Sequence, residues 1–398
     1  MGDAPRMVAA MTPGHDPGPH RDTVRRITLG KDNMRSRFHG LKLNLLAGFG
    51  ALLLAGLAQP AAAQDKGSVT VSSYGGRYQD GLRKVVFQPF QAESGIVVKE
   101  AEASGNAAPT VKAMVMAGNV DIDVIQVSGS EYLLLSKQEF LEKIDASKLD
   151  QTAIGQYEPS GIQTYGVAYF RSASVIAYST KKYSRENHPR TMEEFWDVKK
   201  FPGQRIVPAG NYVVHPNEFA LMADGVAPDK LYPLDLDRSY DSLDKIRTYS
   251  RFVNSAAIAP QALIDGEADL AIATQGRIIE LRDHGAPIDL EWNEGTTGPT
   301  YLVIPKGSKH VAEALKYISF AMQAKVQAEF ARLLPYGPTN QDAFKYLSPA
   351  EVANLPSAPE NRAKLVELHD DWWAATDASG KTNTEKNIAK WTAWTTQR

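Results

Sequence analysis

The chain of 398 residues contains no cysteine. This absence excludes disulfide bonds, thiolate nucleophiles, iron–sulfur clusters and cysteine-ligated zinc. It also removes the cysteine that accepts a lipid in a bacterial lipoprotein, so we expect no lipid anchor. Charge of either sign is not in excess, because 44 basic and 46 acidic side chains leave a formal net charge of −2. No global electric field therefore favours nucleic acid or an anionic membrane as a partner.

Motifs of catalysis and of metal binding are also missing. The sequence has no G-x-S-x-G elbow, no H-E-x-x-H pair, no P-loop and no G-x-G-x-x-G turn. The histidines beyond residue 63 stand apart, without the spacing of metal ligands: His188, His215, His284, His310 and His369. We therefore expect no enzyme, no metal and no cofactor. A periplasmic enzyme whose residues assemble only in space remains an alternative.

Long apolar runs are scarce, and the one near the N-terminus has the order of an export signal. That region contains, in sequence, Arg35, Arg37 and Lys42, the apolar run 43–57, and Ala61-Ala62-Ala63. The run is shorter than the ~20 residues that a membrane span needs, and basic, apolar and small segments in this order form a secretory signal peptide. We expect residues 1–63 to be an N-terminal extension and signal peptide, with translation starting at Met1 or Met34. The mature protein is then periplasmic, and a membrane anchor is the alternative.

Beyond residue 66 the pattern alternates between strands and helices. Short runs rich in valine and isoleucine are typical of buried strands, and they lie at 69–73, 96–98, 122–127, 174–178, 205–207, 269–274 and 287–292. Amphipathic stretches separate them, and Gly95 and Gly118 mark helix ends. This alternation predicts an α/β fold of mostly parallel sheets flanked by helices. The pattern occurs twice without a flexible linker, so we expect two lobes, joined by short crossover strands that act as hinges around a cleft.

Polar loops follow three of the predicted strands, at 73–77, 128–131 and 274–277. In open α/β sheets the carboxyl ends of the strands line the ligand crevice. Glycine lets backbone N–H groups approach a ligand, and serine, glutamine and arginine add hydrogen-bond donors. We expect the three loops to converge on one binding site. The candidate residues are Tyr74, Gly75, Arg77, Ser128, Ser130, Thr274, Gln275 and Arg277.

In their order and spacing, several segments resemble the spermidine/putrescine-binding family of periplasmic solute-binding proteins of ABC transporters. These segments are 69–74, 123–128, 264–270, 275–277, 302–305 and 336–340, and the resemblance covers about residues 67–375. It implies a two-lobed periplasmic-binding-protein fold of type II, with the ligand cleft between the lobes. Lobe 1 is expected at 67–174 and 299–343, and lobe 2 at 175–298 and 344–398. The family resemblance also implies a monomer that closes on a small solute and delivers it to an inner-membrane permease.

The same resemblance assigns cleft positions one at a time. The residues that match the family's cleft are Tyr74, Ser128, Tyr336 and, near the ligand side of the C-terminal segment, Trp372. Two positions depart from the family. Thr274 stands where the family has a cleft tryptophan, and Thr300 stands where it has the aspartate that holds a polyamine ammonium group.

The sequence leaves two classes of ligand as alternatives. The resemblance implies a polyamine such as putrescine or spermidine, or a related amine, which needs carboxylates and aromatic walls. Glu131, Glu218 and Glu294 are candidates to replace the missing charge. Arg277 favours the alternative, an amino acid or a small organic anion or phosphonate, because guanidinium pairs with carboxylates and phosphates and repels cations. A chemoreceptor-coupled sensor has the same sequence features.

Overall fold

The computed structural model describes residues 66–102, 107–158 and 160–396. The predicted N-terminal extension and signal peptide lie outside the described residues. The strands are β1 (Ser68–Ser73), β2 (Val97–Glu102), β3 (Val124–Ser128), β4 (Ile162–Gln163), β5 (Gly166–Ser179), β6 (Arg205–Pro208), β7 (Ser250–Val253), β8 (Leu270–Thr274), β9 (Ile288–Val303), β10 (Gly337–Pro338) and β11 (Val366–Glu367).

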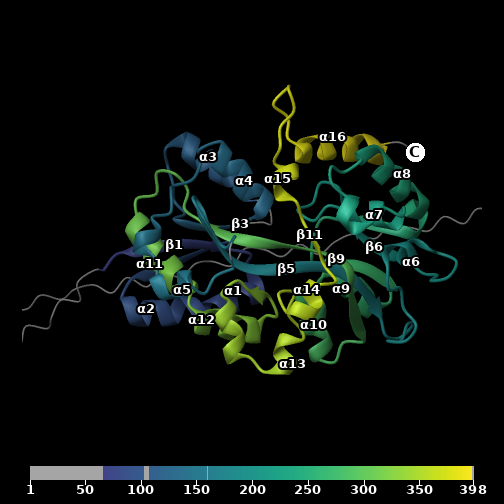
Figure 1. Ribbon diagram of the computed structural model, residues 1–398, viewed down its shortest axis with the longest axis horizontal. Helices are drawn as coiled ribbons and strands as arrows, with labels where there is room; N and C mark the ends of the chain where they lie inside the picture. The colour runs from purple at the N-terminus through teal and green to yellow at the C-terminus, as the bar shows by residue number, and fades with distance from the viewer. Residues whose placement is uncertain (1–65, 103–106, 159, 397–398) are drawn as a thin grey trace, which may run out of the picture. The chain divides into compact units, whose positions relative to one another are not determined.

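Helices fill most of the sequence between the strands (Figure 1). The α-helices are α1 (Gly76–Leu82), α2 (Gln88–Ser94), α3 (Ala108–Ala117), α4 (Gly129–Lys137), α5 (Gln151–Ile154), α6 (Met192–Trp196), α7 (Asn217–Ala223), α8 (Leu236–Ile246), α9 (Ile258–Asp265), α10 (Gln275–Asp283), α11 (Val311–Ala321), α12 (Ala324–Leu333), α13 (Pro349–Val352), α14 (Pro359–Arg362), α15 (Asp370–Trp373) and α16 (Asn383–Thr396). Shorter 3₁₀ or π turns lie at Arg83–Phe87, Ala146–Lys148, Pro228–Lys230, Arg247–Tyr249 and Gln341–Tyr346. The predicted helix ends at Gly95 and Gly118 are confirmed, and both glycines have the left-handed backbone that such ends favour.

The main strands form one sheet in the order β2-β1-β3-β9-β5-β8-β6-β7. Strand β1 runs parallel to β2 and β3, and β6 runs parallel to β7 and β8. Between these two parallel groups, β9 and β5 are antiparallel to each other and to their outer neighbours. The predicted α/β architecture with parallel strands at each end is confirmed, and two long antiparallel strands connect the ends.

The two connecting strands are longer than the sequence predicted. Strand β5 has 14 residues and β9 has 16, where the apolar runs indicated only 174–178 and 287–292. The middle of β5 contains Arg171, Ser172 and Ser174, and the middle of β9 is rich in threonine and glycine, which weakens the apolar signal in both strands. The pairing nevertheless continues there, with Ser172 opposite Gly298 and Ser174 opposite Thr296. A break in hydrophobicity was therefore not a break in the strand.

Buried apolar residues form separate cores toward the two ends of the sheet. At the β1–β3 end, one core packs α1, α2, α11 and α12 on one face and a second packs α3 and α4 on the other. At the β6–β8 end, α6, α7, α8 and α16 pack on one face, and α9 and α10 on the other (Figure 1). Helices thus cover both faces at each end, which explains why β3 and β8 are buried at every position but the last.

The chain after β10 contacts both ends of the sheet. Leu355 and Ala358 pack against Ala331 of α12, at the β1–β3 end. Farther along, Trp373, Trp391 and Trp394 pack in the core of the β6–β8 end. The lobe boundaries expected at residues 174, 298 and 343 stay predictions.

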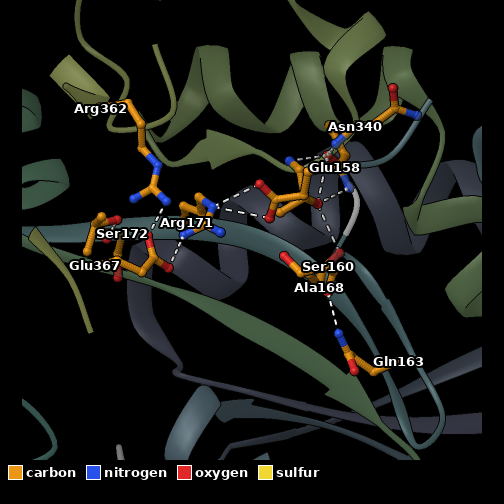
Figure 2. Close-up of polar contacts among 12 residues, drawn as sticks. Glu158, Ser160, Gln163, Ala168, Arg171, Ser172, Asn340, Arg362 and Glu367 are labelled. Carbon is orange, nitrogen blue, oxygen red and sulfur yellow. Dashed lines mark hydrogen bonds and ion pairs between the residues drawn. The ribbon is translucent and has the colours of Figure 1, made fainter. Parts of the chain in front are cut away.

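A buried arginine lies in the middle of β5, on the face opposite Ser172 (Figure 2). The Arg171 side chain is 5% exposed, with its Nε 3.1 Å from Glu158 and its Nη1 2.8 Å from Glu367. Arg362 forms a further ion pair with Glu367. Burial acts to lower the pKa of Arg171, but the two carboxylates together raise it. This cluster ties β5 to the segment before β4 and to β11.

We expect Arg171→Met to destabilise the protein by about 3–5 kcal/mol, because it leaves two carboxylates without their buried partner. Urea unfolding at pH 7 measures the loss. Arg251→Met is the matched control, since the Arg251–Glu267 pair is more than half exposed and contributes below about 1 kcal/mol. Equal losses for the two variants would contradict the assignment of Arg171 as a buried anchor.

Candidate functional site

A cavity of about 370 Å³ lies where the three predicted loops meet. Residues from the loops after β1, β3 and β8 all contribute to its wall. The predicted residues that line it are Tyr74, Gly75, Arg77, Ser128, Ser130, Thr274, Arg277, Thr300 and Tyr336. The loops therefore come together at one place, as the strand-end argument expected, and the binding role of each residue stays a prediction.

Two predicted residues, Gln275 and Trp372, are not among those that line the cavity. The buried Gln275 amide accepts a hydrogen bond from the Ala173 N–H at 2.9 Å and donates one to the Pro335 carbonyl at 2.8 Å. Trp372 packs against Tyr232, and its neighbour Trp373 lines the cavity instead. Adjacent side chains on a helix point in different directions. The predicted position is therefore wrong by one residue, and the neighbouring tryptophan reaches the cavity.

The middle segments of β5 and β9 line the base of the cavity. Side chains alternate between faces along a strand, so Phe170, Ser172 and Ser174 of β5 share the cavity face. On β9, Thr296, Gly298 and Thr300 line the cavity as well. The pairing places Ser174 opposite Thr296 and Phe170 opposite Thr300. The polar middle segments of β5 and β9, which the sequence analysis did not recognise as strand, therefore form the hydroxyl-bearing surface that faces the cavity.

One wall of the cavity is aromatic. The Tyr74 ring lies edge-on to Tyr78 at 5.2 Å between centroids, and the Tyr336 ring lies 5.7 Å from Tyr78 and 4.7 Å from Phe170. The Tyr74 side chain is also hydrogen-bonded to Thr300. Desolvation in the cavity wall raises the pKa of Tyr336 and also that of Tyr74, although Tyr74 is 39% exposed, so both phenols stay neutral at physiological pH. This wall suits an apolar stem or a cation held against ring faces.

The N-terminus of α10 forms the positive side of the cavity. Thr274 precedes the helix without a side-chain cap, and no acidic residue lies in the first turn. A helix N-terminus carries roughly half a positive charge, to which Arg277 adds a full one. Among the described residues, no carboxylate forms an ion pair with Arg277; its charge faces the phenols of Tyr336 and Tyr212. This side of the cavity is therefore suited to an anionic group.

The second arginine of the cavity is already paired. Arg77 of α1 places its Nε 2.7 Å from the Glu280 carboxylate of α10, which is 7% exposed. Helix α1 packs in the core of the β1–β3 end, and α10 packs at the β6–β8 end. The ion pair therefore connects the two ends of the sheet across the cavity and leaves little net charge there.

The three glutamates that were candidates for the missing negative charge have different surroundings. Glu131 lines the cavity. Glu218 lies behind the cavity wall, where one carboxylate oxygen accepts hydrogen bonds from Tyr232 and Trp373, and burial raises its pKa. Glu294 accepts a hydrogen bond from the Met192 N–H and is not among the lining residues. A further acidic residue that the sequence analysis did not select, Asp370, does line the cavity.

Sequence reasoning also missed the loop after β6. Its residues Tyr212, Val214 and His215 line the cavity. The His215 ring packs on Trp373 with 4.0 Å between ring centroids. Burial lowers the pKa of His215 to about 4, so this imidazole is neutral at physiological pH and supplies no cation.

None of the helices in the described residues combines the length and the apolar character that crossing a membrane would take. Within the same residues, no three acidic or histidine side chains are grouped so that they would bind a metal ion.

Comparison with known proteins decides the family. The family model described as bacterial extracellular solute-binding protein matches residues 86–360. The chain belongs to this family. It is the substrate-binding component of an ABC transporter, because members of the family bind small solutes and work with ABC permeases. The resemblance noted from the sequence is confirmed.

Relatives with named ligands differ in what they bind. The gamma-aminobutyric acid-binding protein of Pseudomonas aeruginosa is 32% identical over 332 residues, or 82% of this chain and 92% of that protein. The spermidine/putrescine-binding periplasmic protein of Escherichia coli is 26% identical over 231 residues, 55% of this chain and 64% of that protein. A periplasmic binding protein of A. tumefaciens R10, solved with agropinic acid, is 34% identical with a TM-score of 0.73, and the match covers 83% of this chain and 99% of that one.

Acid should destabilise the protein through His215. Its pKa is about 4 in the folded state and about 6.5 when unfolded, so the unfolded state binds more protons between these values. Stability from this residue is complete above pH 6.5 and is lost as the pH falls toward 4. We expect the free energy of unfolding of the wild type to fall by about 2 kcal/mol more than that of His215→Gln between pH 7 and pH 4.5. Parallel pH curves for the two proteins would contradict a half-buried, neutral His215.

Proposed function

We propose that this substrate-binding component captures a small solute with both a carboxylate and an ammonium group, of which γ-aminobutyrate is the simplest representative. The observation that carries the proposal is Arg277, which faces the cavity without a carboxylate partner among the described residues. A solute carboxylate at the N-terminus of α10 would supply that partner. The similarity to a gamma-aminobutyric acid-binding protein over 82% of the chain supports the same class.

The charges of the cavity favour this class over a polyamine. A polyamine carries an ammonium group at each end, and one end would lie near Arg277 and the positive end of α10. Like charges at short range destabilise binding. The Glu280 carboxylate on α10 could attract an ammonium group, but it is already paired with Arg77. The polyamine class stays a prediction, and the experiment below separates the two.

A hydroxylated amino acid derivative is the second candidate. Ser172, Ser174 and Thr296 line the base of the cavity, and their hydroxyl groups make no hydrogen bond to another described residue. Such hydroxyl groups can form hydrogen bonds with hydroxyl groups of a ligand. The cavity volume also falls within the range of roughly 300–1,000 Å³ that is typical of pockets for larger small molecules. The related protein solved with agropinic acid shows that the family includes ligands other than γ-aminobutyrate.

We infer that the two lobes close on the solute and that the closed form is recognised by the permease of the transporter. The predicted lining residues Tyr74, Ser130 and Tyr336 would then contact the solute from the β1–β3 end, and Arg277 from the β6–β8 end. The ligand would stabilise the form in which both groups of contacts are made. Export to the periplasm and the monomeric state stay predictions.

A ligand screen followed by one substitution tests the proposed class. The purified protein is heated with γ-aminobutyrate, other amino acids, putrescine or spermidine; a ligand at 100 times its dissociation constant adds about 2.7 kcal/mol of stability. We expect stabilisation by γ-aminobutyrate or another amino acid. Arg277→Met should then raise the dissociation constant of that ligand by about 30-fold to 1,000-fold, because a buried charge pair is lost.

Arg251→Met is again the matched control, because its ion pair is on the surface, and it should bind the ligand as the wild type does. Stabilisation by polyamines alone would contradict the proposed ligand class. An amino acid that binds Arg277→Met as tightly as the wild type would contradict the role of the guanidinium.

A further inference from the structure

Three carboxylates from the described part of the chain line the cavity, and two of them already have protein partners. Glu131 accepts hydrogen bonds from the backbone N–H groups of Ala107, Ala108 and Ser128 and from the Ser128 hydroxyl, at 2.7–3.0 Å. Glu280 is paired with Arg77 at 2.7 Å. Asp370, at the start of α15, is the third, and no basic side chain among the described residues forms an ion pair with it. A cation that enters the cavity therefore finds its least occupied acidic partner at Asp370.

Two glycines make the space in which the Asp370 carboxylate lies. A Cβ atom at Gly129, the first residue of α4, would collide with that carboxylate, and one at Gly298 of β9 would lie 3.9 Å from Oδ2. The carboxylate also accepts a hydrogen bond from the Ser130 N–H. The backbones of α4 and β9 thus fix the side chain, and both glycines line the same cavity.

The charges around Asp370 disfavour its ionised form in the empty protein. Burial raises the pKa of Asp370, Glu367 of β11 raises it further and Glu218 of α7 adds to the effect; the Ser130 N–H and Arg171 of β5 act in the opposite direction, and the resulting pKa is about 7. Tyr301 of β9 also faces it, and burial raises the pKa of that phenol, which stays neutral. A ligand cation would supply the compensating charge that the protein does not.

We propose that Asp370 binds the cationic end of the solute, while Arg277 binds its anionic end. The inference rests on the proposed function for the anionic end only, since Asp370 would bind the ammonium group of an amino acid or of an amine alike. The two charged residues come from different sides of the cavity. Arg277 belongs to α10 at the β6–β8 end, whereas Asp370 lies on the N-terminus of α4 at the β1–β3 end.

The arrangement explains how one cavity distinguishes the two ends of a small solute. Helix N-termini are positive, and both α4 and α10 point theirs into the cavity. At α4, the carboxylates of Glu131 and Asp370 outweigh the roughly half charge of the helix. At α10, Arg277 adds to it. The cavity thus has a negative end and a positive end, which orient a zwitterion in one direction.

Isothermal titration calorimetry with three probes tests the assignment. The probes are γ-aminobutyrate, butyrate, which lacks the amine, and putrescine, which lacks the carboxylate. Asp370→Asn at pH 8 should raise the dissociation constant of γ-aminobutyrate at least about tenfold and leave that of butyrate within about twofold. For the wild type, γ-aminobutyrate affinity should fall up to about tenfold from pH 8 to pH 6, because Asp370 takes up a proton over this range. Asp370→Asn should lose this pH dependence.

Asp371→Asn is the matched control, because the neighbouring Asp371 is exposed and does not line the cavity; it should bind as the wild type does. Thermal unfolding of both variants checks that the fold is kept. Unchanged γ-aminobutyrate affinity in Asp370→Asn would overturn this inference and leave the proposed function standing. If putrescine alone binds and needs Asp370, the proposed function fails and this inference stands. If the wild type binds no probe, both are wrong.

Discussion

The antiparallel pairing of β5 with β9 is the interaction on which the rest of this structure depends. These two strands hydrogen-bond to each other along most of their length and carry β3 on one side and β8 on the other. Each parallel group therefore attaches to the same pair of strands, and the loops after β1, β3 and β8 open toward its middle. Residues of β5 and β9 also belong to the cores at both ends, such as Tyr169 and Leu302 at one end and Tyr178 and Ile288 at the other, so the same pairing supports the cavity walls and the cores behind them.

The two faces of this strand pair have different tasks. On the cavity face, Ser172, Ser174 and Thr296 line the cavity with hydroxyl-bearing side chains. On the opposite face, Arg171 is buried between Glu158 and Glu367. Alternation along a strand makes this division possible, because successive residues point to opposite sides. The middle of β5 is thus held on the face away from the cavity by an ionic cluster of specific geometry.

Sequence reasoning found the α/β fold and the three loops because both leave local signals. Buried parallel strands are rich in apolar residues, and the loops after them carry glycine beside polar residues. The sequence analysis named Glu131 only as a candidate for the missing charge, whereas the structure shows that it forms a capping box with Ser128 at the start of α4. The long strands escaped detection because their polar middles face a cavity, a circumstance that no local pattern reveals.

Asp370 and His215 escaped detection for a different reason. Each residue lies on a segment distant in sequence from the three predicted loops. The pKa of each side chain depends on neighbours that only tertiary packing brings close. The sequence around Asp370 shows two adjacent aspartates, and only the collision of a Cβ at Gly129 with one of them reveals which faces inward. The same glycine begins α4 directly after the predicted Ser128 loop. The sequence analysis expected glycine in this loop to let backbone N–H groups approach a ligand, and the structure shows that Gly129 also makes room for the carboxylate of Asp370, 241 positions later in the chain. This contact between distant segments is what gives the cavity its negative end.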